Sequence, residues 1–180
     1  MYKNEEELRE RLNSFVEIAR SHSWPLNIYL AVIGITDVPF GKEVELNESA
    51  EGVLMQALHT LSAMEEQCMI KLFKEQKSWE SICGELDISA VELYENVFMS
   101  IRRLRRPESS YRIRQQGILA WQDGPLPEPV PTDEQKEAAV RLARKSGLGK
   151  DNITASFIRI KMWINYGTAL ALKKYLEETL

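Results

Sequence analysis

A proline-rich stretch limits the folds open to this chain more than any other feature of its sequence. Residues 123–131 contain four prolines, Pro125, Pro127, Pro129 and Pro131. Proline fixes one backbone dihedral angle and has no amide hydrogen, so such a stretch neither continues a helix nor enters the interior of a sheet. It favours an extended, semi-rigid spacer. We therefore expect residues 132–180 to fold as a unit of their own.

Outside this spacer, apolar residues recur with the period of a helix. In residues 5–21 the recurring positions are Leu8, Leu12, Phe15, Val16 and Ala19. The same spacing predicts further helices over residues 24–33, 53–61 and 62–73. Ser62 and Glu65 predict a capping box at the start of the last of these. Because strand-like alternation occurs only at residues 42–46, we predict an all-α fold, a helical bundle with a three-helix C-terminal unit.

Composition and motifs exclude several classes of protein. Hydrophobic residues make up 44% of the 180 and charged residues 28%, as in globular proteins. No apolar run approaches the length of a membrane-spanning helix, and the acidic start is unlike a signal peptide, so we expect a cytoplasmic protein without a membrane partner. Cys68, Cys83 and two histidines predict neither a disulfide nor a zinc site. No carboxylate pair, nucleophilic triad or phosphate loop has the spacing that catalysis needs, so we expect no enzyme activity, cofactor or metal.

The net charge of −4 is unevenly distributed along the chain. Residues 1–60 carry 5 basic and 10 acidic side chains, whereas residues 61–116 carry 9 and 9 and residues 117–180 carry 9 and 8. One dense basic cluster, opposed only by Glu108, contains Arg102, Arg103, Arg105, Arg106, Arg112 and Arg114. These arginines either bind phosphates or an acidic partner, or they only solvate a helix end and favour its dipole.

Residues 78–106 have the pattern of a helix-turn-helix. A helix that buries Ile82 ends at Asp87, a residue that tolerates a left-handed turn. Ser89 then caps the next helix. This second helix has one apolar stripe, formed by Leu93, Val97, Ile101 and Leu104.

Further residues extend this pattern on both sides of the motif. They are Leu58-His59-Thr60-Leu61, Glu65-Glu66, Ile70-Lys71-Leu72-Phe73, Ile82-Cys83, Leu86, Ile88-Ser89 and Ile101-Arg102-Arg103-Leu104-Arg105-Arg106-Pro107. With them, residues 53–113 resemble the fourth conserved region of sigma-70 family transcription initiation factors. The resemblance implies a unit that binds promoter DNA and docks on RNA polymerase, and its basic ending can hold backbone phosphates.

The surface that would contact base edges differs from the corresponding surface in that family. Sigma factors of this kind carry Arg and Gln near the start of the second helix, because these side chains donate hydrogen bonds to base edges. The corresponding surface here consists of Ala90, Val91, Glu92, Tyr94 and Glu95. Since carboxylates repel phosphates, the resemblance implies the family's scaffold with a changed reading surface.

The C-terminal unit also combines helices with a turn. Thr132 caps a helix that ends at Gly147, a second helix covers residues 153–162, and a third follows the turn at residues 163–165. Residues that extend the pattern are Ile153-Thr154-Ala155-Ser156, Arg159, Ile164-Asn165-Tyr166, Ala169, Leu172 and Leu176-Glu177. With them, residues 134–178 resemble the winged-helix gamma domain that ends FtsK-type DNA translocases, without its wing. That domain recognises short oriented chromosomal sequences.

This second resemblance implies phosphate contacts and a recognition-helix surface. The phosphate contacts fall to Arg159, Lys161, Lys173 and Lys174. The recognition surface consists of Gly167, Thr168 and Ala171. Because the family has Asn and Arg there, no target sequence is implied. The alternative is a plain three-helix packing unit with solvated lysines.

The whole chain is expected to contain an acidic helical unit at 1–47, the sigma-like domain at 48–122, the linker at 123–131 and the second helix-turn-helix unit at 132–180. These parts predict a DNA-binding transcriptional regulator of bacterial or phage origin. The alternative is a non-enzymatic adaptor that docks on RNA polymerase or another protein through apolar residues such as Phe98. The apolar N-terminal helices also predict self-association. The target DNA sequence and the direction of regulation stay open.

Overall fold

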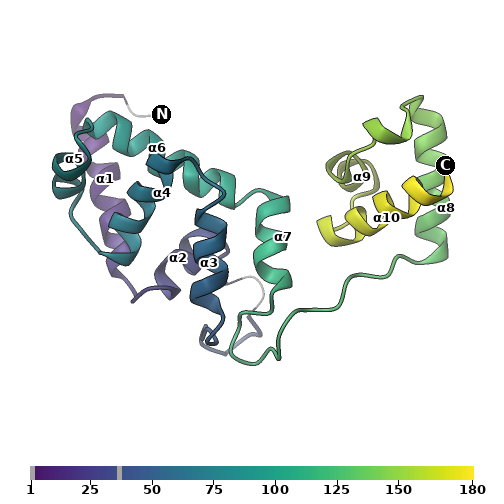
Figure 1. Ribbon diagram of the computed structural model, residues 1–180, viewed down its shortest axis with the longest axis horizontal. Coiled ribbons are helices and arrows are strands. Elements are labelled where there is room, and N and C mark those ends of the chain that lie inside the picture. The colour runs from purple at the N-terminus through teal and green to yellow at the C-terminus, as the bar shows by residue number, and fades with distance from the viewer. Residues whose placement is uncertain (1–2, 36–37) are drawn as a thin grey trace. The chain divides into compact units, whose positions relative to one another are not determined.

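The computed structural model describes residues 3–35 and 38–180, apart from the side chain of residue 150, and confirms the all-α prediction (Figure 1). In residues 1–125 the helices are α1 (Glu5–Arg20), α2 (Leu26–Val32), α3 (Ala50–Leu58), α4 (Ala63–Met69), the π-helix η1 (Ile70–Lys74), α5 (Trp79–Leu86), α6 (Ala90–Leu104) and α7 (Pro107–Gln115). In residues 126–180 they are α8 (Asp133–Ser146), the 3-10 helix η2 (Lys150–Asn152), α9 (Ala155–Met162) and α10 (Tyr166–Thr179).

The chain folds into two compact units, residues 1–125 (unit 1) and 126–180 (unit 2), each around its own hydrophobic core. The boundary falls inside the proline-rich stretch, which forms neither helix nor strand. The parts expected as separate units before residue 123 share the core of unit 1, where Leu12 of α1 and Val97 of α6 are both buried. The reason is that α1 cannot bury its apolar stripe alone, so the stripe packs against α6 and η1.

A buried asparagine ties three helices of unit 1 together. Asn27 of α2 has no exposed surface, and its Nδ2 donates to the carbonyl oxygens of Ala19 and Phe73, both at 2.7 Å. These carbonyls lie near the ends of α1 and η1, where a helix leaves its last C=O groups without intrahelical partners. The amide therefore satisfies carbonyls that burial would otherwise leave unpaired.

The brief strand-like alternation that ends at Leu46 forms a single β-bridge, to Leu119, and no strand. Asn47 extends this contact by donating from Nδ2 to the carbonyl oxygen of Gly117 at 2.7 Å. Gly117 has a φ of +63°, and a Cβ at this position would lie 1.9 Å from the carbonyl oxygen of Gly124. Glycine is required here, because both the left-handed backbone and the close approach exclude a side chain.

Unit 2 packs three helices around a small core, as the sequence predicts. Ala139 of α8, Ile158 of α9 and Leu172 of α10 are fully buried there. Thr132 caps α8 with its side chain, and Gly147 ends the helix in the left-handed conformation, with a φ of 66°. The described residues of unit 2 include no strand and hence no wing. Across the described part of the whole chain, none of the helices has the length and apolar character needed to span a membrane.

Candidate nucleic-acid and partner-binding surfaces

The turn between α5 and α6 contains the left-handed residue that the sequence predicts. Asp87 has a φ of 51° and a ψ of 49°, and its N–H and that of Ile88 both donate to the carbonyl oxygen of Cys83. Ser89 then caps α6, its side chain accepting a hydrogen bond from the backbone N–H of Glu92. The left-handed residue closes the end of α5 and the cap fixes the first turn of α6, so together they set how α6 follows α5.

The turn between α9 and α10 repeats this backbone geometry in unit 2. Trp163 has a φ of 55° and a ψ of 42°, and its N–H and that of Ile164 both donate to the carbonyl oxygen of Arg159. Asn165 caps α10, its side chain accepting from the N–H of Thr168 at 2.8 Å. The two turns therefore share the left-handed residue, the doubly accepting carbonyl and a capping residue two positions later.

One residue of the expected recognition surface of α6 belongs to the core instead. Tyr94 is 4% exposed and stacks on the rings of Phe15 and Phe98, at centroid distances of 5.9 and 5.7 Å. Its hydroxyl accepts a hydrogen bond from Nη1 of Arg11. The expectation for Tyr94 is wrong because α1, which the sequence assigns to a separate unit, covers it.

The other residues of that surface offer no hydrogen-bond donor to a base edge. Ala90 is half-buried against the core of unit 1. Glu92 faces solvent, but its carboxylate accepts hydrogen bonds from the backbone N–H and side chain of Ser89, which lowers the pKa of Glu92. Glu95 is exposed. The start of α6 therefore presents carboxylates, which neither donate to bases nor attract phosphates.

The expected recognition surface of α10 is largely turned inward. Gly167 and Thr168 are buried, and Ala171 is half-buried. The expectation fails here because the apolar stripe of α10, which includes Leu172, runs along the same side of the helix and packs into the core with α9. Lys174 is exposed on α10 instead.

Two arginines of the basic cluster are held by other parts of unit 1. Nη1 of Arg103 lies 2.6 Å from Oε2 of Glu65, a carboxylate that is only 5% exposed. Arg105 donates from Nε and Nη2 to the carbonyl oxygen of Ala31, at 3.0 and 2.6 Å. Ala31 lies in the last turn of α2, where a guanidinium satisfies an orphan carbonyl and favours the helix dipole.

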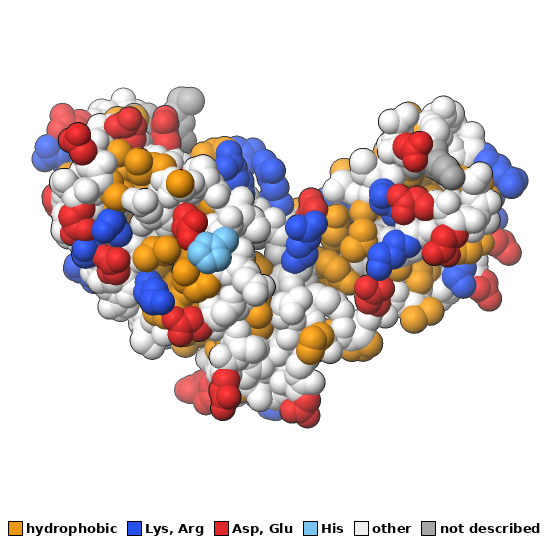
Figure 2. Space-filling model, viewed as in Figure 1, with side chains coloured by type: hydrophobic (Ala, Val, Ile, Leu, Met, Phe, Trp, Pro, Cys, Tyr) orange, Lys and Arg blue, Asp and Glu red, His pale blue; other side chains and the backbone are white. Residues whose placement is uncertain are grey.

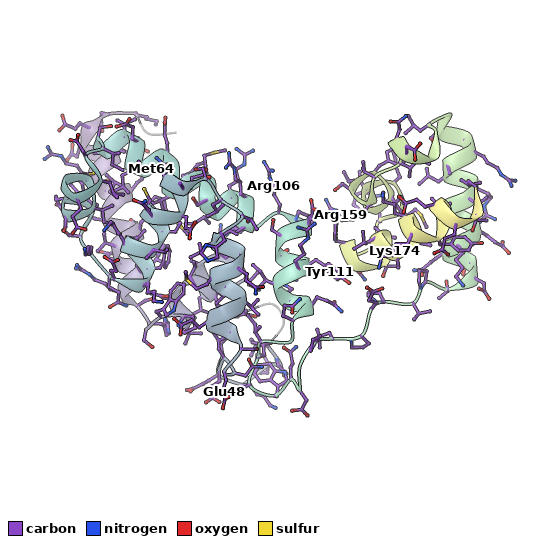
Figure 3. All side chains as sticks on the ribbon, viewed as in Figure 1. Glu48, Met64, Arg106, Tyr111, Arg159 and Lys174 are labelled. Atoms are coloured by element: carbon purple, nitrogen blue, oxygen red, sulfur yellow. The ribbon has the colours of Figure 1, made fainter. Side chains whose placement is uncertain are left out.

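Three arginines, Arg102, Arg105 and Arg106, line a groove of about 500 Å³ between α1, α2 and α6, which we call the α1/α6 groove. Basic side chains gather beside the junction of α6 and α7 in Figure 2, and Arg106 points outward there in Figure 3. The apolar lining includes Phe15 and Ile18 of α1, which sequence reasoning did not assign to this site. The residue that could have indicated this site is Ile18, which is apolar, lies outside the buried stripe of α1 and is 43% exposed.

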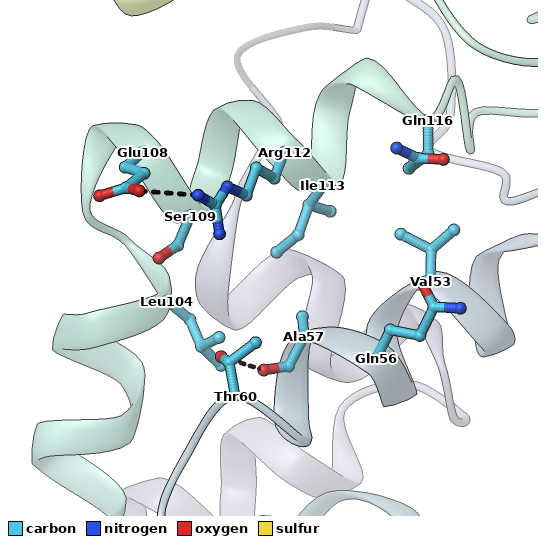
Figure 4. A pocket seen from close by; sticks show the side chains of 10 residues that line it. All are labelled: Val53, Gln56, Ala57, Thr60, Leu104, Glu108, Ser109, Arg112, Ile113 and Gln116. Atoms are coloured by element: carbon cyan, nitrogen blue, oxygen red, sulfur yellow. Dashed lines mark hydrogen bonds and ion pairs between the residues drawn. The ribbon is translucent and has the colours of Figure 1, made fainter. Parts of the chain in front are cut away.

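Arg112 lies apart from this groove, at a second pocket of about 440 Å³ between α3 and α7 (Figure 4). Its Nη2 bonds to Oε1 of Glu108 at 2.8 Å, and apolar side chains such as Ala57 and Ile113 line the same pocket. Arg114, on the same helix, is half-buried. The six arginines therefore do not form one continuous face.

The predicted phosphate contacts of unit 2 lie on α9 and α10. Lys161 is exposed, and Arg159 is half-buried, with an Nε that has no hydrogen-bond partner among the described residues. Lys173 and Lys174 each pair with a glutamate of unit 2, at 2.5 and 3.1 Å. Sequence reasoning missed Trp163, which is 93% exposed at the turn between α9 and α10. The sequence feature that could have indicated Trp163 is an aromatic residue shortly before the capping residue of a helix.

The ionisable groups of unit 1 are shifted by burial and by ion pairs. Burial raises the pKa of the Cys68 thiol to about 11 and also raises that of Cys83, so both thiols are neutral at pH 7. Lys71 and Lys77 hold the pKa of Glu85 at about 2.

The described residues include no group of three or more His, Cys, Asp and Glu side chains placed to hold a metal ion. Comparisons of the chain with family models, curated proteins and solved structures give no match.

Proposed function

We propose that this protein binds DNA through its helix-turn-helix units, mainly that of unit 2, with contacts to backbone phosphates rather than to base edges. The shared geometry of the α5–α6 and α9–α10 turns carries the proposal. A helix-turn-helix holds its second helix against the first so that the second can lie against DNA. Two such units act together, because the spacer raises the effective concentration of one once the other is bound.

Charge favours unit 2 as the main DNA contact. Residues 126–180 carry 9 basic and 7 acidic side chains, whereas residues 1–125 carry 14 and 20. Lys161 is exposed on α9 and Lys174 on α10. Basic side chains that neutralise phosphates release counterions, which favours binding at low salt.

Neither second helix carries, at its start, the side chains that distinguish base pairs. Glu92 and Glu95 are exposed near the start of α6, and Gly167 and Thr168 are buried at the start of α10. Arg, Asn and Gln serve to recognise bases, and none of them occupies these positions. We therefore expect an affinity that depends strongly on salt and weakly on DNA sequence.

Fluorescence anisotropy with a labelled duplex of about 20 base pairs tests this proposal at low salt. Lys161→Ala combined with Lys174→Ala is expected to weaken binding roughly tenfold, since each removes a phosphate contact. The control is Arg9→Ala with Arg112→Ala, which removes the same charge from unit 1, where each guanidinium pairs with a glutamate one turn away. Equal losses in both variants would show that net charge alone matters and would contradict the assignment to unit 2.

A second candidate function is docking on another protein through unit 1. Val91 and Phe98 of α6 are 36% and 40% exposed, and Glu95 lies exposed between them along the chain. Exposed apolar side chains suit a protein surface better than a DNA backbone. The sigma-like resemblance makes RNA polymerase the partner to test. A pull-down with purified bacterial RNA polymerase should retain the wild-type protein and lose Val91→Glu, and equal retention of both would contradict this role.

A further inference from the structure

The floor of the α1/α6 groove is apolar and preformed. Ile18 and Phe98 are 43% and 40% exposed, which leaves large apolar surfaces open to solvent. Phe98 is held by stacking on Tyr94, which in turn stacks on Phe15. Because packing already fixes these rings, a ligand that covers them orders few additional side chains.

The rim of the groove is basic and has no carboxylate of its own. Arg105 is fixed by its two hydrogen bonds to the carbonyl oxygen of Ala31. Arg102 lies near the end of α6, and Arg106 lies between α6 and α7. Both are exposed, and within the described part of the chain neither side chain forms a hydrogen bond or ion pair. Unit 1 has 20 acidic side chains against 14 basic ones. Three arginines without a carboxylate in such a unit favour an acidic ligand.

The length of the groove suits a helix. From Phe98 to the end of α6 at Leu104 the helix rises about 9 Å, which corresponds to nearly two turns of a second helix laid beside it. Such a helix places side chains three and four positions apart on one apolar face, and its flanking side chains reach the rim. A DNA backbone fits less well, because Ile18 and Phe98 offer no polar partner to phosphate or sugar oxygens.

We propose that the α1/α6 groove binds an amphipathic helix of a partner protein, with apolar side chains of that helix against Ile18 and Phe98 and its carboxylates paired with Arg102 and Arg106. This assignment rests on the docking role proposed for unit 1 and gives that role a partner of defined chemistry. It places the contact on α1 as well as α6.

The test uses the full-length protein and a labelled peptide of about 14 residues, with Leu three and four positions apart on one face and Glu beside them. Anisotropy should report binding, and the backbone amide NMR signals of α1 and α6 should shift. A matched peptide with Lys in place of Glu should bind at least tenfold more weakly. Ile18→Gln should weaken binding of the Glu peptide about tenfold while the circular dichroism spectrum is unchanged.

Charge reversal locates the contact. Arg102→Glu with Arg106→Glu should reverse the preference between the Glu and Lys peptides, because both arginines line the groove and hold no other element. Arg9→Glu with Arg112→Glu changes the net charge equally outside the groove lining and should keep the preference.

Three results would overturn the assignment. They are an absence of binding by the Glu peptide up to about 1 mM, equal binding of the two peptides, and displacement of the peptide by duplex DNA that shifts the same amide signals. Failure of the peptide while RNA polymerase still retains the protein would show the groove assignment to be wrong and leave the docking role standing. Failure of both would show both to be wrong.

Discussion

Glu65 is a buried carboxylate with two partners. It is 5% exposed, accepts a hydrogen bond from the backbone N–H of Ser62 in the capping box of α4, and pairs with Arg103 at 2.6 Å. A buried carboxylate that loses its cation is destabilising, because neither water nor another charge compensates it. The Arg103 side chain therefore joins α6 to the start of α4.

We predict that Arg103→Ala lowers the free energy of unfolding by about 1–3 kcal/mol, because it leaves Glu65 without its cation. Arg102→Ala is the matched control, since its guanidinium bonds to nothing within the described residues, and the change should stay within about 0.5 kcal/mol. Urea denaturation followed by circular dichroism measures both. Equal losses would contradict a structural role for Arg103.

Gly117 gives a second prediction at this scale. Gly117→Ala should lower the free energy of unfolding by about 2 kcal/mol or more, because the new Cβ meets the carbonyl oxygen of Gly124 and the backbone is left-handed. Gly52→Ala is the control, since a Cβ at that position of α3 meets nothing within 4 Å. It should stabilise by up to about 1 kcal/mol. Thermal unfolding measures the stability of both variants. Similar changes in the two would contradict the close approach of Gly117 to the carbonyl oxygen of Gly124.

The ion pairs of Glu85 predict a pH dependence. Lys71 and Lys77 lower the pKa of Glu85 from 4.5 to about 2 in the folded protein. Because the folded value is the lower one, these pairs stabilise the fold above about pH 4.5, and their contribution is lost as the pH falls toward 2. Wild type and Glu85→Gln should therefore differ in Tm at pH 6 and converge near pH 2. A difference that stays constant across this range would contradict the pairing.

Local features of single residues could be predicted, whereas their distant partners could not. The capping box of Ser62 with Glu65 and the left-handed Asp87 are both confirmed, because each depends on neighbours within a few positions. The pairing of Glu65 with Arg103 joins residues 38 positions apart. Tyr94 was misassigned for the same reason, since α1 that covers it lies far away in sequence.

At the scale of elements, apolar spacing located most of the helices. The predicted helix over 5–21 corresponds closely to α1, and those at the start and end of unit 2 correspond to α8 and α10. The sequence analysis did not predict α7, which begins at Pro107, although proline is accepted in the first turn of a helix. The packing of α1 on α6, which forms the α1/α6 groove, depends on tertiary contacts that spacing does not contain.

The packing of α1 on α6 predicts that a core substitution in α1 also destabilises α6. Leu12 is 1% exposed, so Leu12→Ala should lower the free energy of unfolding by about 2–5 kcal/mol and reduce hydrogen-exchange protection in α6 as well as α1. Ile18→Ala, at a position 43% exposed on the same helix, should cost less than about 1 kcal/mol. Loss of protection confined to α1 would contradict a core shared by the two helices.

At the scale of the whole molecule, the proline-rich stretch separates two units of opposite charge balance. This separation could be predicted from the sequence, because proline restricts the conformation of its own backbone. The sequence could not predict that residues 1–47 fold together with the following domain, because the two parts share one hydrophobic core that forms only in the folded protein. We propose DNA contact mainly for unit 2, which has 9 basic and 7 acidic side chains, and protein contact for unit 1, which has 14 and 20.

The salt dependence of DNA binding by the full-length protein tests the central claim most directly. Anisotropy titrations between about 50 and 200 mM salt should show the logarithm of the affinity falling linearly with the logarithm of salt concentration. Lys161→Ala with Lys174→Ala should reduce the magnitude of that slope by about 2, one for each phosphate contact removed. An absence of binding at about 50 mM salt, or a slope that the double variant leaves unchanged, would contradict the claim that unit 2 holds DNA by its phosphates.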